Sequence, residues 1–191
     1  MPLTVHCQTG SFAAGKEKKK IDDSTTPENW ATLLNRTDLK TLRINLAHFG
    51  GETGTDDMFE PFRLDKDSWT FIIIKLLKEY PNTYADIAAY DYSKSEHRNN
   101  LLAIFEKDAA GDFGQGHMLA DKLLWGSDVP MVISDKAYRG DISSGSVSEY
   151  KHYIKGFIDT INFSNVFDST AKTMIIQNLT ETNPKKFLKI R

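Results

Sequence analysis

Three side chains of the kinds that bind metals follow short apolar segments in this sequence. His6, His48 and Asp128 each stand where a predicted strand ends. The carboxyl ends of parallel strands form the functional face of α/β proteins, so we expect the three side chains to face one another. Neutral imidazole and carboxylate are ligands that zinc, iron and manganese accept. Such a metal lowers the pKa of a bound water, and a nearby histidine or aspartate moves its proton. The spacing therefore predicts a metal or catalytic site.

Two simpler interpretations apply to the same residues. A single histidine in a strand is more often a hydrogen-bonded core or rim residue than a ligand. Asp128 stands between Gly-Ser and Val-Pro pairs, which is also typical of a turn residue that accepts backbone N–H bonds. Independent turn residues, however, need not all fall at the same end of a parallel sheet, and this coincidence favours a site.

Strands and helices are expected to alternate along the chain. The predicted strands cover residues 2–7, 41–48, 83–90 and 122–125, and the predicted helices cover 26–35, 67–80, 95–108, 149–161, 169–177 and 183–190. Alternation calls for right-handed crossovers and a parallel sheet. A closed barrel of this type needs eight strand–helix units and about 250 residues, so four units make half of one. We predict a single α/β domain over residues 1–191.

Two helix starts carry recognisable capping signals. Thr26 offers a hydroxyl at the N-cap before Pro27 at the first helical position. Asp67 is expected to cap the next helix, whose buried stripe follows the i, i+3, i+4, i+7 spacing. That stripe consists of Trp69, Ile72, Ile73, Leu76 and Tyr80.

Composition narrows the partners of this chain. The formal net charge is −2, from 24 basic and 26 acidic residues, which gives no electrostatic case for nucleic acid or an acidic membrane surface. Cys7 is the single cysteine, so an intrachain disulfide is impossible. No signal peptide and no apolar run of about 20 residues is visible. We expect a cytoplasmic protein that binds neither nucleic acid nor membrane.

Five segments carry a family resemblance. They are Pro2-Leu3-Thr4-Val5-His6-Cys7, Leu46-Ala47-His48-Phe49-Gly50-Gly51, Asn82-Thr83-Tyr84-Ala85-Asp86-Ile87, Leu124-Trp125-Gly126-Ser127-Asp128-Val129-Pro130 and Asn183-Pro184-Lys185-Lys186-Phe187-Leu188. In this order they resemble the closing half of the amidohydrolase superfamily, in the amidohydrolase-related branch of metal-dependent hydrolases, lactonases and non-oxidative decarboxylases. The resemblance implies the C-terminal half of a (β/α)8 TIM barrel.

The resemblance also implies roles for the strand-end residues. His6 matches a metal-binding histidine, and His48 matches a residue that acts as an acid–base group or as a second ligand. Asp128 matches the aspartate that binds the metal, expected to be zinc, and orients or deprotonates the attacking water. The strand that holds Tyr84 and Asp86 would be mainly structural, which leaves Asp86 outside the site.

One departure from the family pattern matters. Family members carry a His-x-His pair on the first barrel strand, and this sequence contains none. As the leading hypothesis, the resemblance therefore implies the C-terminal part of a metal-dependent hydrolase, with an amide, ester or lactone as its small-molecule substrate, or of a non-oxidative decarboxylase. The alternatives are a half-barrel that acts as a subunit, paired with another copy or with a separate N-terminal half, and a non-catalytic binding protein.

Overall fold

A parallel four-stranded sheet forms the centre of the molecule. The computed structural model describes residues 1–7, 25–39, 41–51, 62–88, 90, 92, 94–126 and 145–190, with the backbone alone at 145–152. Within these ranges the strand order is β1-β2-β3-β4, and every neighbouring pair is parallel. The strands are β1 (Pro2–His6), β2 (Arg43–Ala47), β3 (Thr83–Asp86) and β4 (Leu123–Leu124). The predicted α/β class with alternating parallel strands is confirmed, although β3 and β4 are shorter than expected.

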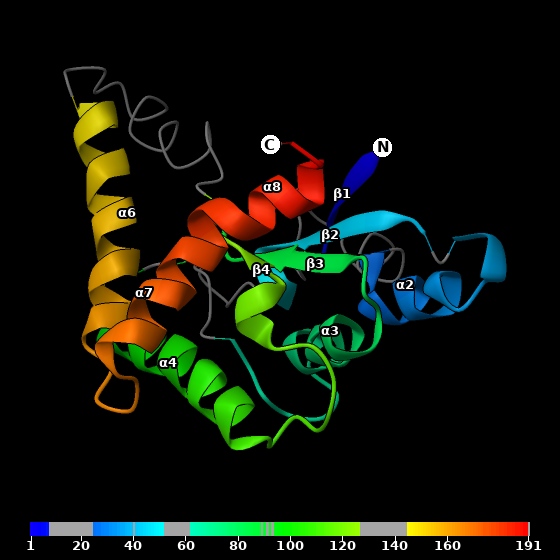
Figure 1. Cartoon of the computed structure of the whole chain (residues 1–191), viewed down its shortest axis with the longest axis horizontal. Coiled ribbons are helices and arrows are strands. Elements are labelled where there is room, and N and C mark those ends of the chain that lie inside the picture. The colour runs from blue at the N-terminus through cyan, green and yellow to red at the C-terminus, as the bar shows by residue number, and fades with distance from the viewer. Residues whose placement is uncertain are drawn as a thin grey trace, which may run out of the picture.

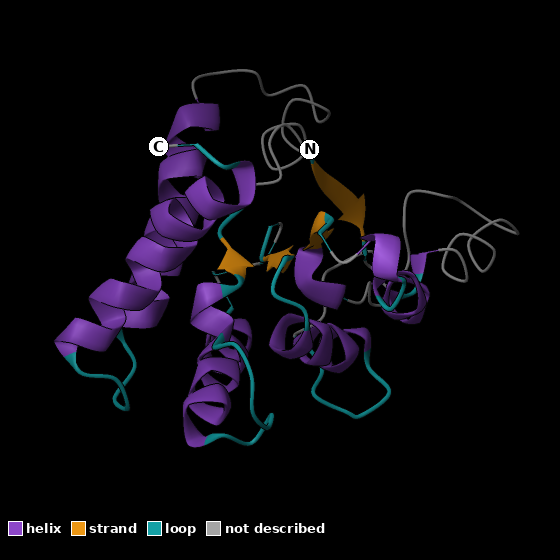
Figure 2. Ribbon diagram, turned by 45° about the vertical axis from the view of Figure 1, so that its right-hand side comes forward, coloured by secondary structure: helices purple, strands orange, loops and turns teal. Residues whose placement is uncertain are grey.

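Helices connect and cover the strands (Figure 1). They are α2 (Pro27–Leu34), α3 (Trp69–Glu79), α4 (Ser95–Ala110), α6 (Gly145–Asn162), α7 (Ser169–Gln177), the π-helical turn η5 (Asn178–Thr182) and α8 (Asn183–Leu188), with the short 3-10 turns η2 (Thr37–Leu39), η3 (His48–Gly50) and η4 (Leu119–Asp121). Figure 2 shows the strands at the centre, with helices around them. None of the described helices combines the length and the hydropathy needed to cross a membrane.

The capping of α2 and α3 and the start of α6 differ from the expectation. The N-cap of α3 is Ser68, whose Oγ accepts a hydrogen bond from the Phe71 amide at 3.2 Å, so the prediction of Asp67 is wrong. The backbone of Ser68 is extended, with a ψ of 148°, as is usual for an N-cap residue, and α3 begins at the next residue. The Thr26 hydroxyl bonds the Glu28 carboxylate and does not cap α2. Helix α6 begins at Gly145, four residues earlier than predicted.

The two faces of the sheet differ in chemistry. Ile44, Leu46, Ala85 and Leu123 occupy one face and are fully buried. They join a core that includes residues of α3 and α4: Ile73, Ile74, Leu77, Leu101 and Ile104. The opposite face presents Asn45, Tyr84, Asp86 and Leu124, and Phe187 of α8 packs against Tyr84 and Leu124. A parallel sheet is usually apolar on both faces, so the buried Asn45 and Asp86 side chains are unusual here. Thr83, also fully buried, is a polar residue on the first face.

The two outer strands of the sheet, β1 and β4, have different neighbours. The Trp125 amide, just after β4, donates to the Leu179 carbonyl at 2.9 Å, and this contact seats η5 against that edge. The buried Asn183 side chain donates to the carbonyls of Ala120 and Leu123, both at 2.8 Å. At the other edge, β1 pairs only with β2 in the described part of the chain, and Leu3 is 37% exposed.

Candidate functional site

The carboxyl ends of β1 and β2 bring two histidines together. His6 is the last residue of β1 and pairs with Ala47, so His48 follows directly beside it. The two imidazole rings lie edge to face, with centroids 5.0 Å apart and an interplanar angle of 67°. The Nδ1 atom of His48 is buried and has no hydrogen-bond partner among the described residues. A buried nitrogen in this state is available to a metal or to a proton.

A strained turn determines where the His48 ring lies. His48, Phe49 and Gly50 all have positive φ, at 65°, 49° and 70°. A non-glycine residue in such a conformation costs about 1–3 kcal/mol, and such strain is concentrated at functional sites. The Phe49 side chain is fully buried and packs edge to face on Phe62 at 5.1 Å, which holds the turn from within the core. The Gly50 amide donates to the Cys7 carbonyl at 3.1 Å.

Asp86, which sequence analysis leaves outside the site, contacts this turn. Its carboxylate lies at the carboxyl end of β3 and is 8% exposed as a residue. Oδ1 accepts hydrogen bonds from the amides of His48 at 3.0 Å and Ala88 at 3.1 Å. Oδ2 accepts from Nδ2 of Asn45 at 2.6 Å. Asp86 could have been found by the rule that selected the histidines, since it too ends a strand.

Cys7 stands beside the histidines and is chemically inert. Its thiol is fully buried and donates to the Thr25 carbonyl at 3.6 Å. Burial, with a smaller contribution from the charge of Glu28, raises the pKa of this thiol to about 12. Because the thiolate is the reactive form, Cys7 is a poor nucleophile at neutral pH.

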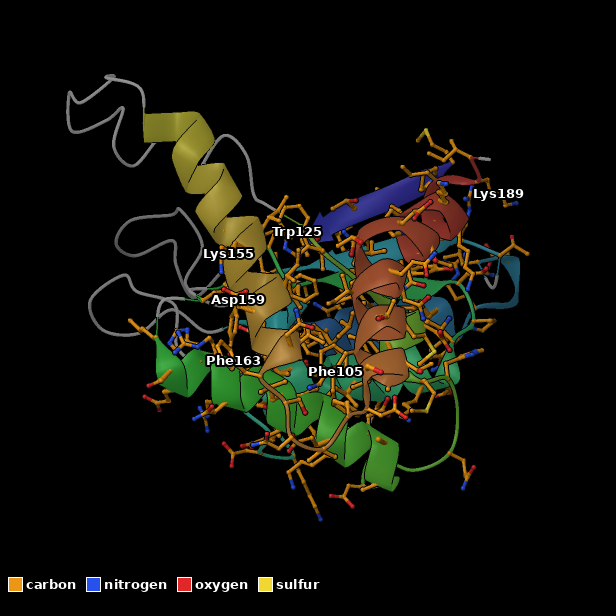
Figure 3. All side chains as sticks on the ribbon, turned by 60° about the vertical axis from the view of Figure 1, so that its left-hand side comes forward. Phe105, Trp125, Lys155, Asp159, Phe163 and Lys189 are labelled. Carbon is orange, nitrogen blue, oxygen red and sulfur yellow. The ribbon has the colours of Figure 1, made fainter. Side chains whose placement is uncertain are left out.

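Aromatic residues border the carboxyl ends of β3 and β4. Trp125 follows β4 (Figure 3), and its ring lies 5.8 Å from that of Tyr153 on α6. The Tyr153 hydroxyl accepts from the Tyr90 amide at 2.9 Å and donates to the Ile87 carbonyl at 3.3 Å. Tyr92 packs on Tyr153 at 5.1 Å, and burial raises its pKa well above the ordinary value. These contacts hold α6 beside the carboxyl ends of β3 and β4.

The predicted site residues therefore have different outcomes. His6 and His48 lie together at the predicted edge, whereas Asp128 falls outside the described residues and remains a prediction. At Gly126, the last described residue before it, a Cβ would lie 3.0 Å from the Cβ of Ala88 and 3.6 Å from that of Asp86. Among the described residues, no three His, Cys, Asp or Glu side chains are grouped so that they could hold a metal ion.

The histidine pair fits a divalent metal as two ligands. Imidazole nitrogen is a common donor to zinc, and the unpartnered, buried Nδ1 of His48 is the kind of atom that a metal would satisfy. A catalytic zinc takes three protein ligands and leaves one position for water or substrate. The described residues thus supply two donors of the right kind, and at least one more must come from elsewhere.

Comparison with known proteins gives one weak structural similarity. No protein-family model matches it, and no curated protein sequence matches it. Among solved structures, it is similar to a probable 2-pyrone-4,6-dicarboxylic acid hydrolase from Acinetobacter baumannii with citric acid bound, at 13% identity and a TM-score of 0.49. The match covers 98% of this chain and 64% of that one. A similarity of this size carries no argument about function, and the fold class rests on the strand pairing.

Proposed function

We propose that this chain is the C-terminal half of the barrel of a metal-dependent hydrolase of the amidohydrolase-related family. The observation that supports the proposal is the approach of the His6 and His48 rings to 5.0 Å at the carboxyl edge of a parallel sheet. The strained turn at His48 adds support, because a fold retains such a conformation only where its surroundings impose it.

Each proposed residue has a distinct role. His6 and Asp128 would hold the metal, expected to be zinc, with His48 as a further ligand or as the acid–base group. When bound, the metal would polarise a substrate carbonyl and lower the pKa of water. His48 and Asp128 would move the proton between water and the leaving group. The substrate class is a small organic amide, ester or lactone, with non-oxidative decarboxylation as the other reaction of this family.

Zinc binding by the purified chain tests the proposal. We expect about one equivalent of zinc by elemental analysis, with an affinity measurable by isothermal titration calorimetry. The variants His6→Ala and Asp128→Ala should each weaken binding at least tenfold, and His48→Ala should do the same where His48 is the further ligand. His117→Ala is the matched control, because His117 lies before β4, at the opposite end of the sheet. Zinc binding that is absent, or that is unchanged in the three site variants, would contradict the proposal.

A second candidate function is supported by the open edge of the sheet. In the described part of the chain, β1 pairs on one side only, and a strand with an unpaired edge is a template for another strand. We propose as the alternative that the chain acts as a subunit, joined to another copy or to a separate N-terminal half. Light scattering after gel filtration tests this alternative, and a strictly monomeric chain at micromolar concentration would exclude self-pairing.

A further inference from the structure

The Asp86 carboxylate is shared between three donors that belong to two strands and the turns after them. Asn45 lies within β2, His48 lies in the turn that follows β2, and Ala88 lies just after β3. All three donors are uncharged, and Asp86 is nearly buried. A buried carboxylate is costly unless hydrogen bonds satisfy it, so these three bonds form one unit whose parts depend on one another.

One of these bonds acts directly on the candidate site. The His48 amide donates to Asp86, and His48 is itself the residue with a φ of 65°. The next two residues also have positive φ. Within the turn, the Gly51 amide donates to the His48 carbonyl at 2.9 Å. Asp86 therefore holds the amide side of His48, while the turn itself holds the carbonyl side. With both sides held, the Cα–Cβ direction of His48 is set toward β1.

We propose that Asp86 is the positioning residue for His48: its carboxylate holds the His48 amide and so keeps the imidazole against His6. The consequence for metal binding rests on the proposed function, whereas the geometric claim does not. Asp86 acts on His48 through the backbone amide. It is therefore a positioning residue and not a catalytic one.

Two variants of Asp86 separate the hydrogen bond to His48 from the charge of the carboxylate. In Asp86→Asn, the side-chain oxygen can still accept from the amides of His48 and Ala88. The Asn45 amide can turn so that its buried Oδ1, which has no partner among the described residues, accepts from the new NH2 group. Asp86→Leu has a similar branched shape but leaves the His48 amide without its acceptor.

The readout is the nuclear Overhauser effect between the ring protons of His6 and His48 in the full chain without metal. We expect this effect in the wild type and in Asp86→Asn, and its loss in Asp86→Leu. Asp121→Leu is the matched control, because Asp121 also accepts from an asparagine, Asn178, at 2.9 Å but stands before β4. The control should leave the effect unchanged. With His48 as a ligand, zinc affinity should fall tenfold or more in Asp86→Leu and be largely retained in Asp86→Asn.

A folded Asp86→Leu chain that retains the effect between the two rings overturns the inference. Loss of the effect in Asp86→Asn, or failure of that variant to fold, also overturns it. If Asp86→Leu does not fold, hydrogen exchange of the His48 amide in the wild type decides: strong protection supports the inference, and exchange as fast as that of an exposed amide overturns it. A wild type that binds no zinc yet shows the expected ring contacts refutes the proposed function and leaves the positioning role intact.

Discussion

The imidazole ring of His6 lies edge to face against that of His48, with centroids 5.0 Å apart. Parallel pairing brings the ends of β1 and β2 to the same edge, but pairing alone aligns His6 with Ala47. The contact with His48 needs the three positive-φ residues of the turn, which redirect the chain immediately after β2. The site is therefore formed jointly by strand register and by a strained turn.

Gly50→Ala should disrupt this turn. Gly50 has a φ of +70°, and a Cβ there would lie 2.6 Å from the backbone nitrogen of Thr70. Conformational strain and the clash with the start of α3 should together lower the free energy of unfolding by more than about 2 kcal/mol in urea denaturation.

Gly111→Ala is the control for that measurement. Gly111 has a φ of +84° after α4, with open space around its Cα. It should therefore show only the cost of the left-handed conformation, about 1 kcal/mol. Equal losses in the two variants would contradict the importance of the close approach at Gly50.

Removal of one partner from the buried ion pair of Lys78 and Asp108 should be strongly destabilising. The side chains are 6% and 2% exposed, and Oδ2 of Asp108 also accepts from the Leu119 amide at 2.6 Å. Asp108→Ala leaves a buried ammonium group without its partner, which should cost about 3–5 kcal/mol. Chemical denaturation measures the loss.

An exposed pair on α6 is the comparison for Lys78 and Asp108. Lys155 and Asp159 are 68% and 39% exposed, and both are labelled in Figure 3. Asp159→Ala should cost no more than about 0.5 kcal/mol, because water and salt screen an exposed pair. A loss in Asp108→Ala as small as this would show that the buried pair is not maintained in solution.

The thiol of Cys7 should not react in the folded protein. Burial raises its pKa to about 12, so the reactive thiolate is scarce at pH 8. Ellman's reagent should modify one equivalent in guanidinium chloride, since Cys7 is the single cysteine, and almost none without denaturant. Rapid modification of the native chain would contradict the burial of this residue.

Lys122 should make stability depend on pH in the alkaline range. Burial lowers its pKa from 10.5 to about 8, with Lys186 adding to the shift and Asp121 opposing it. Between these two values the unfolded chain holds a proton that the folded chain has released, so the free energy of unfolding contributed by Lys122 rises with pH. Below pH 8, both states are protonated and the full cost of burying the charge remains.

Comparison of the wild type with Lys122→Met between pH 7 and pH 10.5 isolates this contribution. The wild-type free energy of unfolding should rise relative to that of the variant across the interval. Lys155→Met, which removes an exposed lysine of α6, shows the change in stability with pH that does not depend on burial of the charge. Parallel curves for the wild type and Lys122→Met would contradict the shifted pKa.

Local sequence signals determined the elements of this fold. Helix α7 spans the predicted residues 169–177, and Pro27 begins α2 as expected, because capping and apolar periodicity act over a few neighbouring residues. The alternation of strands and helices predicted the parallel sheet, since right-handed crossovers leave few other arrangements. The strand-end rule placed His6 and His48 at one edge for the same reason.

Tertiary structure alone decided how the site is arranged. The sequence of β3 contains no sign that the Asp86 carboxylate would bond the His48 amide, because that contact joins residues far apart in the chain. The left-handed conformation of His48 is likewise unfavourable locally and is held by the buried ring of Phe49, the Gly50 amide on Cys7 and Asp86. Periodicity and capping report what neighbours favour, whereas the direction of a functional side chain depends on distant partners that hold the backbone against its own preference.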